Sequence, residues 1–241
     1  MTALHAPRPG FTWTAAPAGL RVPRPEQRAA TLGDVSADQP AAPAAGPAEP
    51  GGVVCVVLAG GTSRRFGGGD KTAAPLGGTT VTGTLVASLG ALPVVVVGPE
   101  AGGGPASALA AGLARLGGPA RDTNRDPAGD ADVVVALAGD LPFAGTAVPR
   151  LVAGLRSAPD DVDAVLGVDP GGRRQFLLAA YRAAPLRAAL GTGTDRSTDR
   201  SMRSVVAGLR FAEVPVTAAE ALDVDTAGDL ARAREQLGSG P

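Results

Sequence analysis

The feature that most constrains the fold is an apolar run at residues 53–58 that leads directly into a glycine-rich loop. A continuous apolar run of this length is typical of a central parallel strand that is buried on both faces. The loop that follows, residues 59–71, contains two arginines, an aspartate and a lysine among its glycines. Glycines let backbone N–H groups approach a polyphosphate, and cations neutralise its charge. The sequence therefore predicts a strand followed by a phosphate-binding loop.

Two familiar phosphate-binding motifs do not fit the spacing of this loop. A P-loop that ends in Lys71-Thr72 requires glycine at positions 65 and 70, where the chain has Arg65 and Asp70. The dinucleotide-binding fingerprint requires Gly-x-Gly-x-x-Gly at the start of a helix, and no frame of the loop supplies it. The loop therefore belongs to another class of nucleotide-binding protein.

From residue 53 onward, short apolar runs alternate with Ala- and Leu-rich stretches of helical length. We expect strands at residues 53–58, 93–98, 133–138, 164–168, 175–180 and 211–215, and helices at 81–89, 106–116, 145–157 and 226–237. The polar stretch at residues 117–130 is interpreted as an irregular insertion. This order is typical of an α/β domain with three layers (α/β/α) around a mostly parallel, doubly wound, Rossmann-like sheet. Ligands of such sheets bind at the carboxyl ends of the strands.

Residues 1–50 differ from the rest of the chain. They contain nine of the 22 prolines, long Ala-Pro stretches, and the only tryptophan and histidine. Because no apolar periodicity runs through them, we predict a disordered Ala/Pro-rich N-terminal extension, followed by one folded domain at residues 51–241. A continuous apolar segment of the kind found in secretory signals is missing, so a cytoplasmic location is expected.

The composition limits the possible chemistry. The net charge of −1 and an aromatic content of 3% disfavour binding to nucleic acid or to an anionic membrane. Cys55 is the only cysteine, which excludes an internal disulfide and a cysteine-rich zinc site, and it is expected to be a small buried hydrophobe. His5 is the only histidine, so the folded part cannot use a histidine base. The remaining candidates are carboxylates, Lys, Arg, backbone amides and a bound metal.

Residues 58–71 read Leu-Ala-Gly-Gly, three variable residues, Arg, an apolar residue, Gly-Gly, one residue and Asp-Lys. This pattern resembles the signature of the molybdenum cofactor guanylyltransferase (MobA-like) family of GT-A-like nucleotidyltransferases, with Phe66 where that family usually has Met. The resemblance implies a GT-A type of fold. It also implies that Arg65 and Lys71 bind the triphosphate and stabilise the departing pyrophosphate, while Asp70 orients the loop. The expected nucleotide-binding residues are Leu58, Ala59, Gly60, Gly61, Arg65 and Lys71.

Two later segments carry candidate metal ligands. Asp140 follows the apolar run at 133–138, at the strand end where the nucleotide should lie, and its hard oxygen ligand suits Mg²⁺. The segment around it resembles the family's Asp-Met-Pro-Phe, with Leu for Met. Residues 223–230 resemble the family's Asn-x-Asn-Thr-Pro-x-Asp-Leu element, with Asp at both Asn positions. Asp225 can add a second carboxylate to the metal or cap the last helix, whereas Thr226 is expected to cap it.

The resemblance covers residues 53–237, and it is weakest in the half that should bind the acceptor. Members of the family normally have another strand and an acidic residue between Gly98 and Gly104, where this chain is short and has only Glu100. The segments at 173–177 and 200–204 resemble an acceptor-side strand and a basic loop. Their arginines can meet an acceptor phosphate or remain solvated.

The resemblance implies a Mg²⁺-dependent enzyme that transfers GMP from GTP to a molybdopterin-type cofactor and releases pyrophosphate. Asp140 would be the principal metal ligand and, with Arg65 and Lys71, would form the catalytic group. Molybdoenzyme-maturation proteins are possible partners. Two alternatives remain open at this point. Aspartates at positions 223 and 225 favour a cytidylyl- or other nucleotidyltransferase, and the short segment after Gly98 favours a non-catalytic nucleotide-binding homologue.

Overall fold

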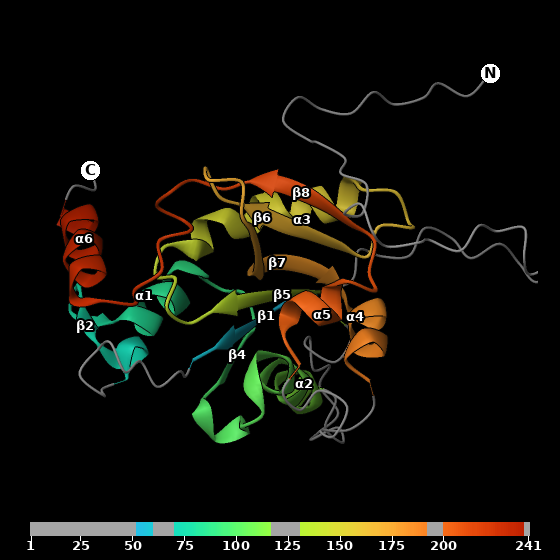
Figure 1. Cartoon of the computed structure of the whole chain (residues 1–241), viewed down its shortest axis with the longest axis horizontal. Helices are drawn as coiled ribbons and strands as arrows, with labels where there is room; N and C mark the ends of the chain where they lie inside the picture. The colour runs from blue at the N-terminus through green and yellow to red at the C-terminus, as the bar shows by residue number, and fades with distance from the viewer. Residues whose placement is uncertain (1–51, 60–69, 117–130, 192–199, 239–241) are drawn as a thin grey trace, which may run out of the picture. The chain divides into compact units, whose positions relative to one another are not determined.

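The computed structural model describes residues 52–59, 70–116, 131–191 and 200–238. The predicted extension at 1–50, most of the glycine-rich loop and the predicted insertion at 117–130 lie outside these residues. The described part of the chain is built around a six-stranded sheet with the order β4-β1-β5-β7-β6-β8 (Figure 1). The strands are β1 (Gly52–Leu58), β4 (Val94–Val97), β5 (Ala131–Ala138), β6 (Ala164–Val168), β7 (Arg174–Arg182) and β8 (Phe211–Pro215).

Five strands run in one direction, and β7 runs against them. Strand β1 pairs in parallel with β4 and β5, and β6 pairs in parallel with β8, whereas β7 is antiparallel to both β5 and β6. The prediction of a mostly parallel sheet is therefore confirmed. Because β7 is reversed, its first residues lie at the edge where the other five strands end.

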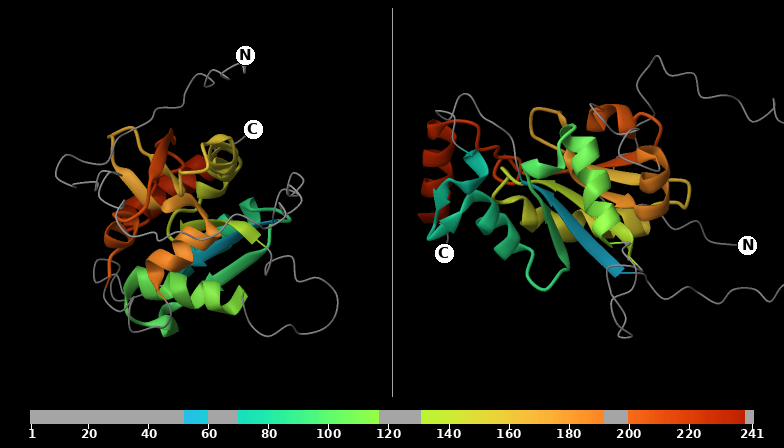
Figure 2. Two further views of the ribbon diagram at one scale, coloured as in Figure 1. Left: turned by 90° about the vertical axis from the view of Figure 1, so that its right-hand side faces the viewer. Right: turned by 90° about the horizontal axis from the view of Figure 1, so that it is seen from below.

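Both faces of the sheet are apolar and covered by helices. Alternate β1 residues point to opposite sides, so Cys55 and Val57 join one core cluster while Val54 and Val56 join another. The first cluster packs under α1 (Val81–Ser88) and α3 (Val148–Ser157), and the second under α2 (Gly104–Leu116), α4 (Ala183–Leu190) and α5 (Met202–Val206). Figure 2 shows α2 and α3 on opposite sides of the sheet. The predicted three-layer α/β/α fold and the buried Cys55 are confirmed.

A third, smaller cluster lies beside the sheet. Strands β2 (Pro75–Leu76) and β3 (Thr79–Thr80) form a hairpin, whose turn residues Gly77 and Gly78 have φ of +58° and +82°. Positive φ at both central positions is what a tight two-residue hairpin turn requires. The last helix, α6 (Ala227–Gly238), packs against this hairpin through Leu76 and Leu230. Figure 1 shows α6 next to β2.

Several elements differ from the sequence-based expectation. The helix predicted at 145–157 begins at Val148, because the short 3-10 turn Ala144–Ala147 comes first and a proline at the helix start fixes its direction. Helix α4 and the β2–β3 hairpin were not predicted. The short stretch after Gly98 forms a 3-10 helix, Pro99–Ala101, before α2 begins. None of the helices in the described ranges is both long and apolar enough to cross a membrane.

Candidate functional site

The strand ends form an open cleft of about 410 Å³ at the carboxyl edge of the sheet. Leu58 and Ala59 line it where β1 ends, and Asp140 lines it just after β5. The turn before α2 completes the wall with a run of small residues, Gly102, Gly103, Gly104 and Pro105. We call this the first cleft. Leu58, Ala59 and Asp140 thus lie together, as the sequence predicted, whereas Gly60, Gly61 and Arg65 lie outside the described residues.

The backbone before Asp140 is packed tightly against the end of β1. The N–H of Gly139 donates to the carbonyl of Leu58 at 2.8 Å, and the Thr82 hydroxyl donates to the carbonyl of Gly139 at 2.8 Å. A Cβ at position 139 would lie only 2.9 Å from the Leu58 carbonyl oxygen. Only glycine fits this approach, and the result is a fixed position for the Asp140 carboxylate.

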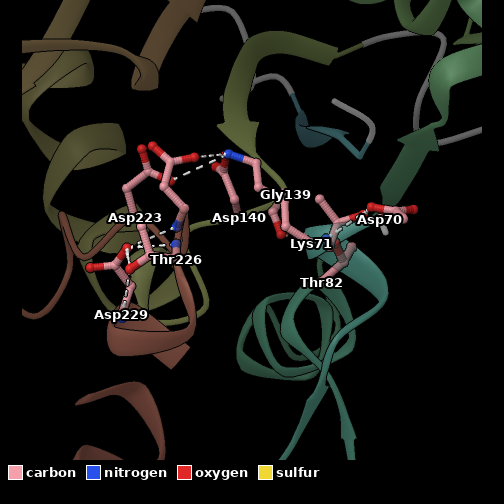
Figure 3. Close-up of polar contacts among 10 residues, drawn as sticks. Asp70, Lys71, Thr82, Gly139, Asp140, Asp223, Thr226 and Asp229 are labelled. Atoms are coloured by element: carbon pink, nitrogen blue, oxygen red, sulfur yellow. Dashed lines mark hydrogen bonds and ion pairs between the residues drawn. The ribbon is translucent and has the colours of Figure 1, made fainter. Parts of the chain in front are cut away.

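Lys71 lies at the centre of a group of three carboxylates (Figure 3). Its Nζ is 2.5 Å from Asp140 and 3.7 Å from Asp223, and it also donates a hydrogen bond to Asp225. Although partial burial alone would lower the pKa of Lys71, its hydrogen bonds to Asp140 and Asp225 raise it above the usual value. Lys71 is therefore a permanent cation in this cluster.

Asp70 positions the segment that carries Lys71. The short helix Lys71–Ala73 begins with Asp70 as its N-cap, and the Asp70 carboxylate accepts bonds from the Thr72 amide at 2.9 Å and the Thr72 hydroxyl at 2.6 Å. Thr72 is buried, so this turn is anchored beside the first cleft. Asp70 therefore orients the turn that carries Lys71, and among the described residues it has no contact with the other carboxylates.

Asp140, Asp223 and Asp225 form what we call the acid cluster. One carboxylate oxygen from each lies within 4.8 Å of the others. The segment after β8 is joined directly to the end of β5, because the N–H of Val224 donates to the carbonyl of Asp140 at 3.0 Å. The Val224 side chain is fully buried, which holds Asp223 and Asp225 on the cleft side.

The pKa values of Asp223 and Asp225 are shifted in opposite directions. Loss of solvent around Asp223, together with the charge on Asp140, raises the pKa of Asp223 to about 7. The hydrogen bond from Lys71 instead lowers the pKa of Asp225. Three hard oxygen donors converging on one point can hold a divalent cation, so the donor set fits a magnesium or manganese ion. Asp223, which sequence reasoning left outside the predicted ligands, completes the set.

The start of α6 is capped by Thr226, as predicted. The Thr226 hydroxyl accepts from the Asp229 amide at 3.2 Å, and the Asp229 carboxylate accepts from the Thr226 amide at 2.7 Å. This reciprocal pair is a capping box. The Asp229 carboxylate also accepts from the Asp225 amide at 3.2 Å. The Asp225 side chain is therefore available to Lys71 rather than used as a cap.

A second cleft, of about 590 Å³, lies on the other side of the acid cluster. Asp223 and Asp225 line it, together with Arg173 from the β6–β7 turn and Arg232 from α6. The remaining wall is formed by the segment after β8 and by Asp229 and Gln236 of α6. The acid cluster therefore separates two clefts, since Asp140 lines the first and the other two aspartates line the second.

The arginines that resembled acceptor-binding residues have structural partners. Arg174 pairs with Glu213 at 2.5 Å and stacks over Phe211, and Arg203 stacks over the ring of Phe176. Arg200 donates to a backbone carbonyl of α4 at 3.1 Å. Among the arginines of these segments, only Arg173 lines the second cleft.

A doubly wound α/β sheet whose carboxyl edge carries a lysine and three aspartates between two clefts is the framework of a nucleotide-handling protein. The chain belongs to the family of the MobA-like NTP transferase domain, whose sequence model matches residues 55–214. Comparison with curated protein sequences gives no match.

Solved structures share this fold. Rv0371c from Mycobacterium tuberculosis H37Rv is 22% identical with a TM-score of 0.54, covering 78% of this chain and 99% of that one. Its homolog from Mycobacterium sp. strain JC1 is 25% identical with a TM-score of 0.53, covering 77% and 96%. Molybdopterin-guanine dinucleotide biosynthesis protein A from Archaeoglobus fulgidus is 18% identical with a TM-score of 0.53, covering 78% and 100%.

Proposed function

We propose that this chain transfers GMP from GTP to the terminal phosphate of a molybdopterin-type cofactor, with release of pyrophosphate and with Mg²⁺ as the metal. The observation that carries the proposal is the acid cluster around Lys71, placed between two clefts at the carboxyl edge of the sheet. Two substrates that react through phosphate groups require two adjoining clefts with a cation-binding group between them. Family membership supplies the class of reaction.

The residues of the chain would act mainly by positioning and by charge. A phosphate oxygen of the acceptor forms a bond to the α-phosphorus of GTP, and the bond from that phosphorus to the bridging oxygen of the β-phosphate breaks. The electron pair leaves with pyrophosphate. Because no proton needs to be removed from an ionised phosphate, the missing histidine base is not required. Lys71, together with Arg65, would stabilise the charge on the leaving group.

The metal would be held by Asp140 and Asp225, with Asp223 as a third donor. When bound, Mg²⁺ supplies charge stabilisation for the phosphate oxygens. A second structure of the M. tuberculosis protein, 20% identical with a TM-score of 0.50, is described as a complex with manganese. That description supports a divalent cation for the same family, and the hard oxygen donors support Mg²⁺ as the physiological choice.

A cytidylyltransferase is the second candidate. The aspartates at positions 223 and 225 replace an asparagine pair of the guanylyltransferases. Similar structures also include a 4-diphosphocytidyl-2C-methyl-D-erythritol synthase, 18% identical with a TM-score of 0.52. Another is a CMP:2-keto-3-deoxy-manno-octonic acid synthetase in complex with CTP, 14% identical with a TM-score of 0.52. The small-residue wall of the first cleft does not choose between the two bases.

The test is a pyrophosphate-release assay with each of the four nucleoside triphosphates, Mg²⁺ and molybdopterin cofactor. We expect GTP to give the highest turnover. Asp140→Asn should reduce it by at least about 100-fold, since it removes a charged ligand. The matched control is Asp160→Asn, which changes an exposed aspartate after α3, at the opposite edge of the sheet.

The other possible results of this assay would each assign a different function to the chain. Faster turnover with CTP than with GTP would replace the guanylyl assignment by the cytidylyl one. Binding of nucleotide without pyrophosphate release from any of the four would support the non-catalytic homologue. Unchanged turnover in Asp140→Asn would remove the metal assignment.

A further inference from the structure

Glu220 is the most buried charged residue of the described part of the chain, with 5% of its surface exposed. It lies in the segment between β8 and α6, three residues before Asp223. Burying a carboxylate costs free energy unless it is fully hydrogen-bonded. The groups that donate these hydrogen bonds are therefore the ones that the carboxylate fixes in position. Although burial alone would raise the pKa of Glu220, hydrogen bonds from Arg150, Thr217 and Thr146 lower it. The carboxylate is therefore ionised at neutral pH.

On one side, Glu220 holds the segment that follows Asp140. The Thr146 hydroxyl lies 3.0 Å from Glu220 Oε1 and 2.9 Å from the carbonyl of Phe143, so its one hydrogen is shared between these two acceptors. A guanidinium nitrogen of Arg150, in the first turn of α3, lies 2.7 Å from Glu220 Oε2. Phe143 and Thr146 come three and six residues after Asp140, in the turn that leads from β5 into α3.

On the other side, Glu220 closes the turn that leads to Asp223 and Asp225. The Thr217 amide donates to Glu220 Oε2 at 2.8 Å, and the Glu220 amide donates to the Thr217 hydroxyl at 3.2 Å. The neighbours of Glu220 in this turn, Ala219 and Ala221, line the second cleft. One buried carboxylate thus connects the two chain segments that supply the acid cluster.

We infer that Glu220 is a positioning residue, which sets the spacing of Asp223 and Asp225 from Asp140 and so controls metal affinity. The inference rests on the proposed function, because it assigns Glu220 to the same metal site. The direct link between the two segments, from the Val224 amide to the Asp140 carbonyl, fixes the backbone at one point only. Glu220 supplies a second fixed point, and two points are needed to set an orientation. Changes in groups that orient metal ligands commonly reduce metal affinity by about 10- to 100-fold.

The test measures binding of Mn²⁺ alone to the full chain, by the electron paramagnetic resonance signal of the free ion, with thermal unfolding followed in parallel. Glu220→Gln keeps the shape of the side chain but replaces one of its two accepting oxygens by an amide donor. The oxygen lost is either Oε2, which accepts from both Arg150 and the Thr217 amide, or Oε1, which accepts from Thr146. Thr146→Val removes only the hydroxyl. Both variants should bind Mn²⁺ about tenfold more weakly. The turnover number should fall, while KM for the triphosphate stays unchanged, because the first cleft contains no residue of this turn.

The matched control is Glu213→Gln, which breaks another partly buried Glu–Arg pair, at 2.5 Å, between β7 and β8. It should lower the melting temperature but leave Mn²⁺ affinity at the wild-type value. Wild-type affinity in both Glu220→Gln and Thr146→Val would overturn the inference while leaving the proposed function intact. Equal loss of affinity in Glu213→Gln would also overturn it, because the effect would then follow stability. Failure of the wild-type chain to bind Mn²⁺ would instead overturn the metal assignment itself, and this inference with it.

Discussion

Lys71 and a divalent cation would compete for the same three carboxylates. The sequence suggests separate tasks, with Lys71 on the triphosphate and Asp140 and Asp225 on the metal, but all of these groups meet in one cluster. An ammonium group paired with three carboxylates repels a second cation that approaches them. A cation bound at the acid cluster would therefore require Lys71 to turn toward the phosphates.

Replacement of this lysine should separate the two tasks. In Lys71→Met, Mn²⁺ should bind about tenfold more tightly in the absence of nucleotide, because the competing charge is gone. Pyrophosphate release should nevertheless fall by at least about 100-fold, since a cation on the leaving group is lost. Calorimetric titration with Mn²⁺ and the release assay measure the two effects. Lys71→Arg is the control that keeps the charge, and weaker Mn²⁺ binding by Lys71→Met than by the wild type would refute competition.

Asp223 gives the cluster a pH dependence. Its pKa in the folded chain is about 7, raised from an ordinary value near 4, so the folded state binds this proton more tightly than the unfolded state does. The carboxylate therefore opposes folding increasingly as the pH rises from about 4 to about 7, and by a constant amount above that range. Without metal, Asp223→Asn should raise the melting temperature at pH 8 and leave it unchanged at pH 4. Scanning calorimetry in EDTA at both pH values measures the two melting temperatures, with Asp160→Asn as the control. An equal change at pH 4 and pH 8 would contradict the prediction.

The elements of the fold were predictable to different degrees. Strand β1 and residues 133–138 of β5 are continuous apolar runs, so both their existence and their burial on two faces follow from the sequence. The direction of β7 does not follow from the sequence, because a strand shows the same pattern of buried and exposed side chains whether it is parallel or antiparallel to its neighbours. The hairpin has strands of only two residues, so it carries no long periodic pattern.

Close packing of α2 on the sheet depends on one glycine. A Cβ at Gly112 would lie 2.6 Å from Val56 and 3.0 Å from Val97, two residues at the centre of the face that α2 covers. Gly112→Ala should destabilise the protein by about 1–3 kcal/mol through overpacking, although alanine favours the helix by about 1 kcal/mol. Urea unfolding at pH 7 measures the difference. Gly238→Ala, at the end of α6 with no atom within 4 Å of the added Cβ, should not destabilise.

At the scale of the whole molecule, the sequence gives the edge of the sheet that carries the site but not the contacts within it. Asp140 and the glycine-rich loop are placed by the rule that ligands bind at strand ends. The contact between Lys71 and Asp225 joins positions 154 residues apart, and it depends on how the segment after β8 returns to β5. That return is fixed by Val224 and Glu220, whose buried contacts leave no motif in the sequence. This is why Glu220 was not predicted as part of the site, and why the sequence favours Asp225 over Asp223 as the second metal ligand.

The predicted extension at residues 1–50 provides a test at this scale. The first described strand, β1, begins at Gly52, directly after this extension. The extension is rich in proline and poor in large apolar side chains, so it has too little apolar surface to pack as a folded element. A chain that starts at residue 51 should therefore keep the wild-type melting temperature, Mn²⁺ affinity and rate of pyrophosphate release. A melting temperature lower by several degrees would show that part of the extension packs on the domain. Loss of turnover alone, with stability and Mn²⁺ affinity unchanged, would instead place it near the acceptor.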